Sequence, residues 1–407
     1  MDSRFASSEF RAEVSNHLST NTAAQGDKPT SSVAAGTDQT ANLAAASAMM
    51  RVYQPIASDL KAVDARLHRE LQSRYEALVP VLRHGTQLGG KRLRPALLLL
   101  SGIAAASPKE SGSPNSPAPK VTSTEVASPK VASPDVASAD QPSETKLSED
   151  HIVMATVVEM VHTATLVHDD VLDNADTRRH VATINARWNN DTSILLGDYL
   201  FAQSFYLAAT LPSTLACRWV GQAAQAVCEG ELRQVLGRDW LDIDEETYLD
   251  MIRGKTAELT RVSCQLGANL SGADEATVAA FGTYGNDLGI AFQIADDYLD
   301  LWGDDSEVGK TLGTDLLQGK ITLPLIRLLR HDDAAIASQA YEALQAEPEK
   351  RLEKIRPLLA QSDAAEYTRQ VADRYRCSAI EAIQNLPASP ALQSLINIAN
   401  FSVDRRF

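Results

Sequence analysis

The sequence of 407 residues predicts an all-α fold. After Pro55, apolar residues recur at helical spacing at Leu60, Val63, Leu67 and Leu71. From Ile152 onward Ala, Leu, Ile and Gln dominate, with few alternating β-branched residues, which favours helices over strands. The chain shows no alternation of strand and helix patterns and no glycine-rich loop after a strand. These observations favour a bundle of helices over a mixed α/β class.

Two segments lack the helical pattern. Residues 1–45 are rich in Ser, Thr, Ala and Asn without periodicity, so they bury too little apolar surface to offset chain entropy and are predicted to be disordered. Residues 107–149 are rich in proline and repeat the sequence Val-Ala-Ser-Pro, which is typical of a low-complexity linker. On composition alone, this linker either separates two domains or forms a loop inserted into one.

Charge and composition argue against several classes of protein. The formal net charge is -15 and no basic stripe with interleaved aromatic residues occurs, which argues against a nucleic-acid partner. The first residues lack the basic and apolar regions of a secretory signal, and the longest apolar run, Pro95–Ala106, is too short to span a bilayer. The four cysteines have no CxxC spacing, which predicts reduced thiols in a cytoplasmic protein rather than a disulfide framework or a zinc site.

The first feature that predicts chemistry is a cluster of aspartates after an apolar run. Asp169 and Asp173 are one helical turn apart, with Asp170 beside them, so their carboxylates converge on one side of a helix. Such like charges repel one another unless a hard divalent cation with a preference for oxygen ligands lies between them. A single cluster of this kind has a plain alternative, a solvated acidic turn. The apolar residues upstream argue against that alternative, because they predict that the helix is buried on most sides.

The same pattern returns 127 positions later, at Asp296, Asp297 and Asp300, again after an apolar helical run. Two such clusters on core helices that face each other across a bundle would hold several Mg²⁺ ions. The open positions of these ions would be bridged by a diphosphate or a polyphosphate. The sequence therefore predicts a magnesium-dependent site for a phosphorylated substrate.

Such a substrate also requires positive side chains near an apolar cavity. Candidate Lys and Arg residues follow both aspartate clusters and also occur in two other local motifs. In one of these motifs, Lys91 and Arg94 come after a double glycine, where the backbone can approach an anion closely. Each cation alone has the plain alternative of a solvated surface residue. The remaining candidates are Arg178, Arg179, Lys255, Lys310 and Lys320.

Five blocks of the sequence, in the same order, resemble the polyprenyl (trans-isoprenyl) diphosphate synthase family. They are GGKRLRP, VEMVHTATLVHDDVLDNADTRR, GKTAEL, FQIADDYLD and GKTLGTDLLQGKITLPLI. The resemblance implies one helical domain, residues 46–407, around a deep central cavity, with residues 107–149 inserted between two core helices. It also implies isopentenyl diphosphate and an allylic diphosphate as substrates, and a homodimer that makes at most transient contact with a membrane for product release.

The resemblance implies a role for each candidate residue. Asp169, Asp173 and Asp296 are implied to bind about three Mg²⁺ ions. Further ligands, or supports for the ligands, are Asp300, Asp170 and Asp297. The implied site for the allylic diphosphate consists of Arg178, Lys255, Thr256, Gln293, Lys310 and Lys320. The implied metal-free site for isopentenyl diphosphate consists of Lys91, Arg94, His162 and Arg179. For His162 alone, the residue pattern leaves the alternative of a hydrogen-bonded core histidine.

Product length is expected to depend on the residues one turn before the first aspartates. Ala164 and Thr165 precede Asp169 by five and four positions. Short-chain relatives tend to carry bulky aromatic residues there, so the small side chains imply a long all-trans product such as octaprenyl or nonaprenyl diphosphate. The alternatives are a geranylgeranyl or farnesyl diphosphate synthase and a non-catalytic subunit of a heteromeric prenyl synthase. A terpene cyclase or a squalene-type synthase has no need of an isopentenyl diphosphate site.

Overall fold

The computed structural model describes residues 51–87, 90–106, 147–178, 181–303 and 312–403. The predicted disordered segment, nearly all of the predicted insertion, Arg179 and Lys310 lie outside the described residues. The body discussed below begins at Val52. Its elements up to the middle of the chain are η1 (Gln54–Ile56), α3 (Ala57–Glu70), η2 (Glu76–Leu78), α4 (Val79–Gln87), α5 (Leu93–Ala105), α6 (Glu149–Leu172), β1 (Thr177–Arg178), β2 (Val181–Ala182), α7 (Ile184–Arg187), α8 (Asn190–Ala208) and α9 (Thr214–Leu236).

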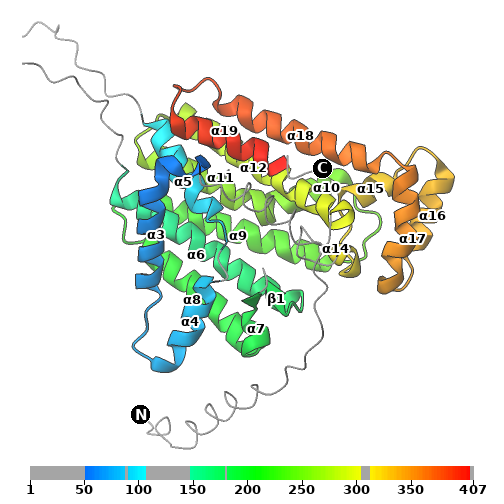
Figure 1. The fold of residues 1–407 in the computed structure, drawn as a ribbon, viewed down its shortest axis with the longest axis horizontal. Helices are drawn as coiled ribbons and strands as arrows, with labels where there is room; N and C mark the ends of the chain where they lie inside the picture. Colours follow the sequence, from blue (N-terminus) through cyan, green and yellow to red (C-terminus); the bar gives the residue numbers. More distant parts are fainter. Residues whose placement is uncertain (1–50, 88–89, 107–146, 179–180, 304–311, 404–407) are drawn as a thin grey trace, which may run out of the picture. The chain divides into compact units, whose positions relative to one another are not determined.

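Helices also make up the second half of the body (Figure 1). They are α10 (Glu245–Ile252), the π-helical turn η3 (Arg253–Ala257), α11 (Glu258–Leu270), α12 (Glu275–Trp302), α14 (Thr314–Leu317), α15 (Leu323–Leu329), α16 (Ala334–Leu344), α17 (Pro348–Gln361), α18 (Ala364–Ile383) and α19 (Pro390–Val403). Among the described residues, the only strands are β1 and β2, which pair as a two-residue antiparallel hairpin. The all-α prediction is confirmed.

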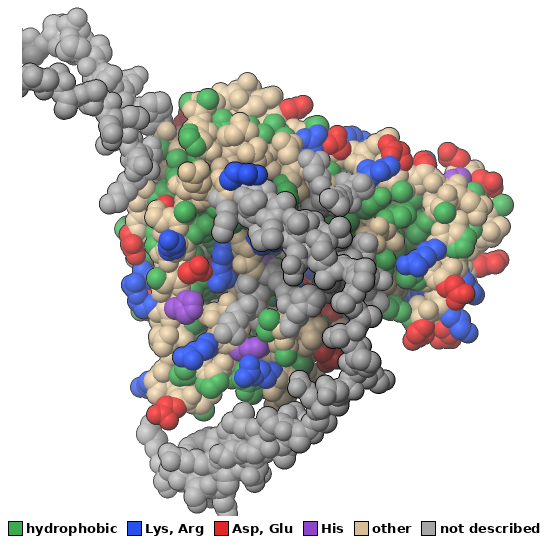
Figure 2. All heavy atoms as spheres, viewed as in Figure 1, with side chains coloured by type: hydrophobic (Ala, Val, Ile, Leu, Met, Phe, Trp, Pro, Cys, Tyr) green, Lys and Arg blue, Asp and Glu red, His purple; other side chains and the backbone are tan. Residues whose placement is uncertain are grey.

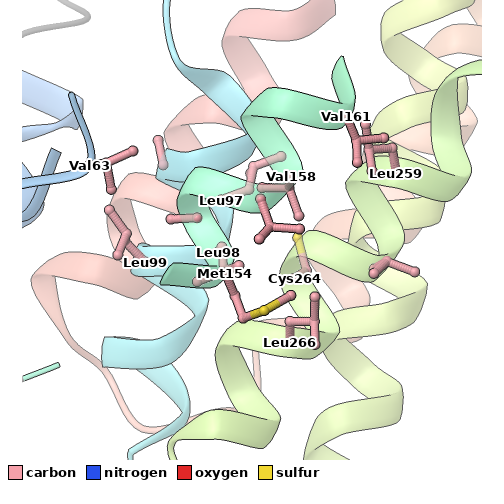
Figure 3. Packing of buried hydrophobic residues seen from close by; sticks show 14 of the residues in the cluster. Val63, Leu97, Leu98, Leu99, Met154, Val158, Val161, Leu259, Cys264 and Leu266 are labelled. Carbon is pink, nitrogen blue, oxygen red and sulfur yellow. The ribbon is translucent and has the colours of Figure 1, made fainter. Parts of the chain in front are cut away.

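The core is built around α6, which packs against α3, α5 and α8. Every residue of α6 from His151 to Val161 is buried, as expected for a helix that is apolar all round. In Figure 3, Val158 of α6 lies between Leu97 of α5 and Leu259 of α11. The burial predicted for the helix that carries the first aspartates is therefore confirmed, and its last turn is the part that leaves the core.

A second apolar cluster fixes the other half of the site. It joins α10, α12 and α15 to α16, α17 and α18, and it includes Tyr248, Ile294 and Leu301. Side-chain caps fix where two of these helices begin: Asp244 accepts from the backbone N–H of Thr247 before α10, and Asp274 caps α12 in the same way. The end of α12, which carries the second aspartates, packs against this apolar cluster through Leu301.

Candidate active site

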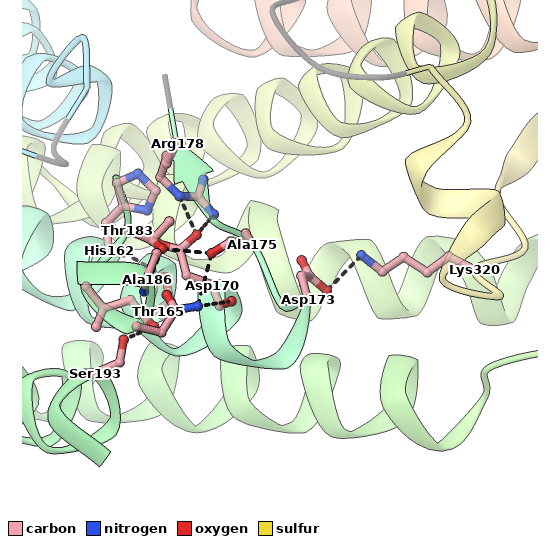
Figure 4. A network of polar contacts seen from close by, with 12 residues as sticks. His162, Thr165, Asp170, Asp173, Ala175, Arg178, Thr183, Ala186, Ser193 and Lys320 are labelled. Carbon is pink, nitrogen blue, oxygen red and sulfur yellow. Dashed lines mark hydrogen bonds and ion pairs between the residues drawn. The ribbon is translucent and has the colours of Figure 1, made fainter. Parts of the chain in front are cut away.

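The first aspartate cluster lies at the carboxyl end of α6. Asp170 is fully buried. Its Oδ1 accepts a hydrogen bond from Nε of Arg178 at 2.8 Å and forms an ion pair with Nη2 of the same side chain at 2.8 Å. The hairpin β1–β2 folds back over the helix end, and the backbone N–H of Ala175 donates to the carbonyl of Asp170 at 2.9 Å. Figure 4 shows this pair with the ring of His162 pointing toward Arg178. Asp170 therefore holds Arg178 in place.

Asp169 and Asp173, by contrast, are only partly buried. Burial raises the pKa of Asp169 to about 6, and repulsion from Glu231 and Asp173 acts in the same direction, while attraction by Lys255 opposes it. Asp173 ends α6, and its Oδ1 lies 3.5 Å from Nζ of Lys320. Two carboxylates one turn apart thus share a strongly charged environment, as the sequence predicts.

The second cluster lies at the carboxyl end of α12. Asp297 is buried, and it accepts hydrogen bonds from the hydroxyl of Tyr248 at 2.6 Å and from Nε2 of Gln293 at 2.8 Å. Burial raises the pKa of Asp297 to about 8. Asp300 accepts from the backbone N–H groups of Thr314 and Asp315 at 3.1 and 3.2 Å. These contacts hold the first residues of α14 against the end of α12.

Lys320 connects the two clusters. Its Nζ lies 3.5 Å from Asp173 and 3.4 Å from Asp315, the residue whose backbone binds Asp300. The side chain is only 10% exposed, so the charge of this lysine acts within the site rather than in bulk solvent. Figure 4 shows Lys320 extended toward Asp173 from the far side of the site. The ends of α6 and α12 therefore face the same space.

A pocket opens between these elements. Its empty space, including that of the open mouth, measures about 610 Å³. It is lined by Gln234, Gly237, Ile243, Tyr248, Met251, Ile252, Lys255, Gln293, Asp297, Asp315, Lys320, Ile321 and Thr322. Two lysines, two acids and several apolar side chains thus line one concave surface, which is the composition expected of a small-molecule site.

The π-helical turn η3 carries Lys255 into this pocket, and Thr256 is the next residue of the same turn. Lys255 forms an ion pair with Glu231 of α9 and donates a hydrogen bond to Oε1 of Gln234 at 2.9 Å. Thr256 donates to Oε1 of Gln293 at 2.8 Å, so the turn is bound to α12 as well. An extra residue in one helical turn is frequent at functional sites, because it redirects side chains that a regular α-helix would point elsewhere. Neither the π-turn nor its contacts were predicted from the sequence.

Two glycines allow η3 to lie between α9 and α12. A Cβ atom on Gly230 would lie 2.6 Å from the backbone nitrogen of Lys255, and one on Gly289 would lie 2.5 Å from the Cα of Ala257. Real Cβ atoms do not come this close to backbone atoms, so either addition would force η3 to move. The position of Lys255 therefore depends on the close approach that these glycines permit.

We expect Gly230→Ala to lower turnover by roughly 10- to 100-fold, because displacement of η3 moves Lys255 away from its working position. Steady-state kinetics with a diphosphate substrate measure the effect. Gly221→Ala on the same helix is the matched control, because a Cβ there would meet only Phe205, at 4.0 Å. Equal turnover in the two variants would contradict this account of η3.

The remaining predicted residues lie at the start of α5 and within α6. Lys91 precedes α5 with its Nζ 5.8 Å from the centre of the Phe401 ring, and Arg94 is partly buried in the first turn of α5. Ala164 is fully buried in α6, and the hydroxyl of Thr165 donates to the carbonyl of His162 at 2.8 Å. None of these contacts tests the roles implied by the resemblance, which stay predictions.

Several residues of the site were missed by the sequence analysis. Glu231 and Gln234 lie three positions apart on one face of α9. The neighbouring Gly230 was the only local sign in the sequence that this part of the helix has a special role. Tyr248 gave no signal, because a tyrosine in an amphipathic helix usually belongs to the core. Arg238 and Asp315 resemble solvated loop charges in the sequence, although the structure places both at the site.

The donor set fits Mg²⁺ that arrives with a phosphorylated substrate. In the part of the chain that the structure describes, no three His, Cys, Asp or Glu side chains come close enough to hold a metal ion on their own. Mg²⁺ commonly uses one or two carboxylates and completes its shell with water and substrate phosphates. Asp169, whose pKa is raised by burial and further by Glu231 and Asp173, offers an oxygen ligand that a divalent cation would stabilise in its charged form.

Comparisons with known proteins agree with this geometry. Heptaprenyl diphosphate synthase component 2 of Geobacillus stearothermophilus is 35% identical over 350 residues, which are 86% of this chain and 96% of that relative. The crystal structure of a decaprenyl diphosphate synthase from Rhodobacter capsulatus matches with a TM-score of 0.72 and 32% identity, over 88% of this chain and 99% of that one. A polyprenyl synthase from Caulobacter crescentus CB15, crystallised with calcium and isoprenyl diphosphate, matches with a TM-score of 0.72 and 29% identity, over 88% and 98% of the two chains. Residues 75–361 match the sequence profile of the family described as Polyprenyl synthetase, and the chain therefore belongs to that family.

Proposed function

We propose that this protein is a prenyltransferase that adds isopentenyl diphosphate units head to tail to an allylic diphosphate, giving a long-chain all-trans polyprenyl diphosphate such as a quinone side chain requires. The observation that carries this proposal is the pocket in which Lys255 and Lys320 lie between two clusters of aspartates. The heptaprenyl and decaprenyl diphosphate synthases among the relatives support a long product.

The aspartates are proposed to bind Mg²⁺, about three ions in the complex with substrate. Asp169 and Asp173 would supply ligands from α6, and Asp296 with Asp300 from α12. When bound, Mg²⁺ would stabilise the negative charge that develops on the departing pyrophosphate. The Caulobacter crescentus relative, crystallised with calcium and isoprenyl diphosphate, supports the use of a divalent cation.

Cationic side chains are proposed to divide the two substrates between them. Lys255, Lys320 and Arg178, with Lys310, would hold the allylic diphosphate, and Thr256 and Gln293 would position its oxygens. The isopentenyl diphosphate site would consist of Lys91, Arg94, His162 and Arg179. Fixed cations around the leaving group favour dissociation of the C–O bond, because they need not reorganise as charge develops.

The apolar part of the pocket would then protect the allylic carbocation from water. The terminal carbon of the isopentenyl double bond attacks the allylic cation, so the positive charge moves to the tertiary carbon of the isopentenyl unit. A proton then leaves C2, beside that tertiary carbon, and the new allylic double bond forms. We assign no side chain as the base, so pyrophosphate held by Lys255 and Lys320 is the proposed acceptor of this proton. Positioning of the two substrates contributes more than any strong base, because the cation is short-lived.

The direct test is an elongation assay with the purified full chain. Labelled isopentenyl diphosphate and Mg²⁺ are supplied with farnesyl or geranylgeranyl diphosphate, and the products are dephosphorylated and sized by chromatography. The proposal predicts incorporation and long products. A geranylgeranyl-sized end product would support the shorter-chain alternative. No incorporation with any primer would support the alternative of a subunit that needs a partner, for which the name "component 2" of one relative is the precedent.

We also propose that two copies of the chain form a homodimer through α8 and α9, which pack side by side. Large apolar side chains are exposed there: Leu195 and Tyr206 on α8 are 66% and 68% exposed, and Leu232 and Leu236 on α9 are 60% and 84% exposed. The residues of each pair share one face of their helix. Such apolar surface on neighbouring helices is typical of a protein interface.

The double variant Leu195→Glu/Leu236→Glu is expected to be a monomer at concentrations where the unmodified chain sediments as a dimer, because four buried charges would oppose association. Sedimentation velocity measures both species. Tyr341→Glu, which changes an exposed aromatic residue on α16, should leave the dimer intact. A monomeric unmodified chain, or a dimeric double variant, would contradict this interface.

Within the described residues, no helix combines the length and the apolar character needed to cross a bilayer. On the face shown in Figure 2, Lys and Arg side chains are scattered among acidic ones. The cytoplasmic location and the transient membrane contact during product release stay predictions from the sequence.

A further inference from the structure

Arg238 is a cation at the first aspartate cluster that the family resemblance does not assign. It lies in the turn after α9, and its Nη2 is 3.9 Å from Oδ1 of Asp173, the same oxygen that Lys320 approaches at 3.5 Å. A separation of 3.9 Å is too long for a hydrogen bond, so Asp173 attracts the guanidinium without binding it. The side chain is 34% exposed and therefore reaches the site while remaining accessible to a ligand.

The guanidinium of Arg238 retains unused hydrogen-bonding capacity. Its Nε is buried and has no hydrogen-bond partner among the described residues. Buried polar atoms are nearly always satisfied in proteins, and an exception beside a binding pocket is explained when a ligand completes the bonds. An arginine has five N–H donors in a planar fork, which match the oxygens of a phosphate in pairs.

The ion pair between Asp239 and Arg351, called the latch below, fixes the turn that carries Arg238. The next residue, Asp239, has a left-handed backbone conformation with φ of 59°, and its Oδ1 accepts a hydrogen bond from Nη1 of Arg351 at 2.6 Å. Arg351 comes from α17 and is itself buried, at 9% exposed. A non-glycine residue in this conformation is strained, so the surrounding contacts must hold it there.

The same latch fixes the turn before Lys320. The backbone N–H of Asp239 donates to the carbonyl of Gly319 at 2.8 Å. Gly319 has φ of 73°, and a Cβ added to it would lie 2.7 Å from Oδ1 of Asp239. The two turns are therefore packed together, and Arg238 and Lys320 are presented to Asp173 as a pair.

We propose that Arg238 is a further diphosphate-binding residue, and that Asp239 and Arg351 position it together with Lys320. This inference rests on the proposed function. Asp173 would hold Mg²⁺ together with Asp169, and Arg238 and Lys320, which lie beside its Oδ1, would then be available to bind phosphate oxygens of the substrate. Arg238 therefore binds the allylic diphosphate and, after the C–O bond has broken, retains the pyrophosphate.

The test measures binding of inorganic pyrophosphate to the full chain in the presence of Mg²⁺ by isothermal titration calorimetry. Arg238→Ala is expected to weaken this binding by roughly tenfold, the size of a hydrogen bond to a charged group. Arg238→Lys should recover part of the loss, because it keeps the charge but not the planar fork. Arg233→Ala, which removes an exposed arginine of α9, is the matched control and should bind as the unmodified chain does.

Kinetics separate a binding role from a merely structural one. Arg238→Ala should raise KM for the allylic diphosphate and leave KM for isopentenyl diphosphate and the melting temperature unchanged. If pyrophosphate binds Arg238→Ala as tightly as the unmodified chain, or more tightly, Arg238 only balances the charge of Asp173 and the proposal is wrong. If the unmodified chain elongates normally and Arg238→Ala shows no defect, this inference alone is refuted. If the unmodified chain never elongates, the proposed function is refuted.

The latch is tested by Arg351→Ala in two backgrounds. In the otherwise unmodified chain, this change should weaken pyrophosphate binding, because both turns lose their support. In a chain that already carries Arg238→Ala and Lys320→Ala, it should have no further effect on binding, because the residues that it positions are gone. The same loss of binding in both backgrounds would overturn the positioning role.

Discussion

Asp169→Asn is expected to lower prenyl transfer by about 10²- to 10³-fold, because it removes a charged oxygen ligand at the point where the leaving group develops its charge. Asp296→Asn, on α12, should lower prenyl transfer by a similar factor. The double variant should lose little more than either single variant, because ligands of one metal cluster act as a unit. Single-turnover rates at saturating Mg²⁺ measure the chemical step directly.

Asp332→Asn is the matched control, since Asp332 is an exposed carboxylate remote from both clusters in the sequence. It should transfer prenyl groups at the unmodified rate. Melting temperatures of all variants should be compared, because a buried or partly buried carboxylate also contributes to folding. Asp169→Asn with full activity and an unchanged requirement for Mg²⁺ would contradict the assignment of the first cluster.

Ala164→Phe is expected to shorten the product, because Ala164 is fully buried one turn below the first cluster and a ring there would fill space that a growing chain needs. The distribution of chain lengths should move to shorter products while the first condensation continues. Reversed-phase chromatography of the dephosphorylated products measures this distribution. The added ring is expected to cost about 1–3 kcal/mol of stability by overpacking, which a folded and active variant can tolerate.

Ala164→Ser is the control for this change, because it adds a single oxygen and no comparable bulk. Its products should have the lengths made by the unmodified chain. If Ala164→Phe folds, retains activity and still makes products of the original length, the growing chain does not pass Ala164. Thr165, whose hydroxyl is bonded to the backbone of its own helix, would then be the next position to test.

The positions of the charged motifs were predictable from the sequence because their spacing is local. Asp169 and Asp173 are one turn apart on any helix, and the apolar residues before them predicted correctly that α6 is buried. The same reasoning placed Asp296 and Asp300 at the end of α12. Periodicity reports which face of a helix is buried, and it gives no information about which other helix covers that face.

The supports of the site were not predictable for this reason. Tyr248 is bonded to Asp297 across 49 positions, and Arg351 is bonded to Asp239 across 112. Such pairs depend on the packing of α10 and α17, which no local pattern encodes. Gly230 gives only a low helix propensity in the sequence, although in the structure it permits the approach of η3.

The central claim is that the carboxylates of α6 and α12 share one cluster of divalent ions that holds the diphosphate. A crystal structure with Mn²⁺ and an unreactive allylic thiodiphosphate tests it, because manganese is located by its anomalous scattering. We expect manganese both beside Asp169 and Asp173 and beside Asp296, joined by a diphosphate that contacts Lys255 and Lys320. Manganese at one cluster alone, or a diphosphate bound away from both lysines, would contradict the claim.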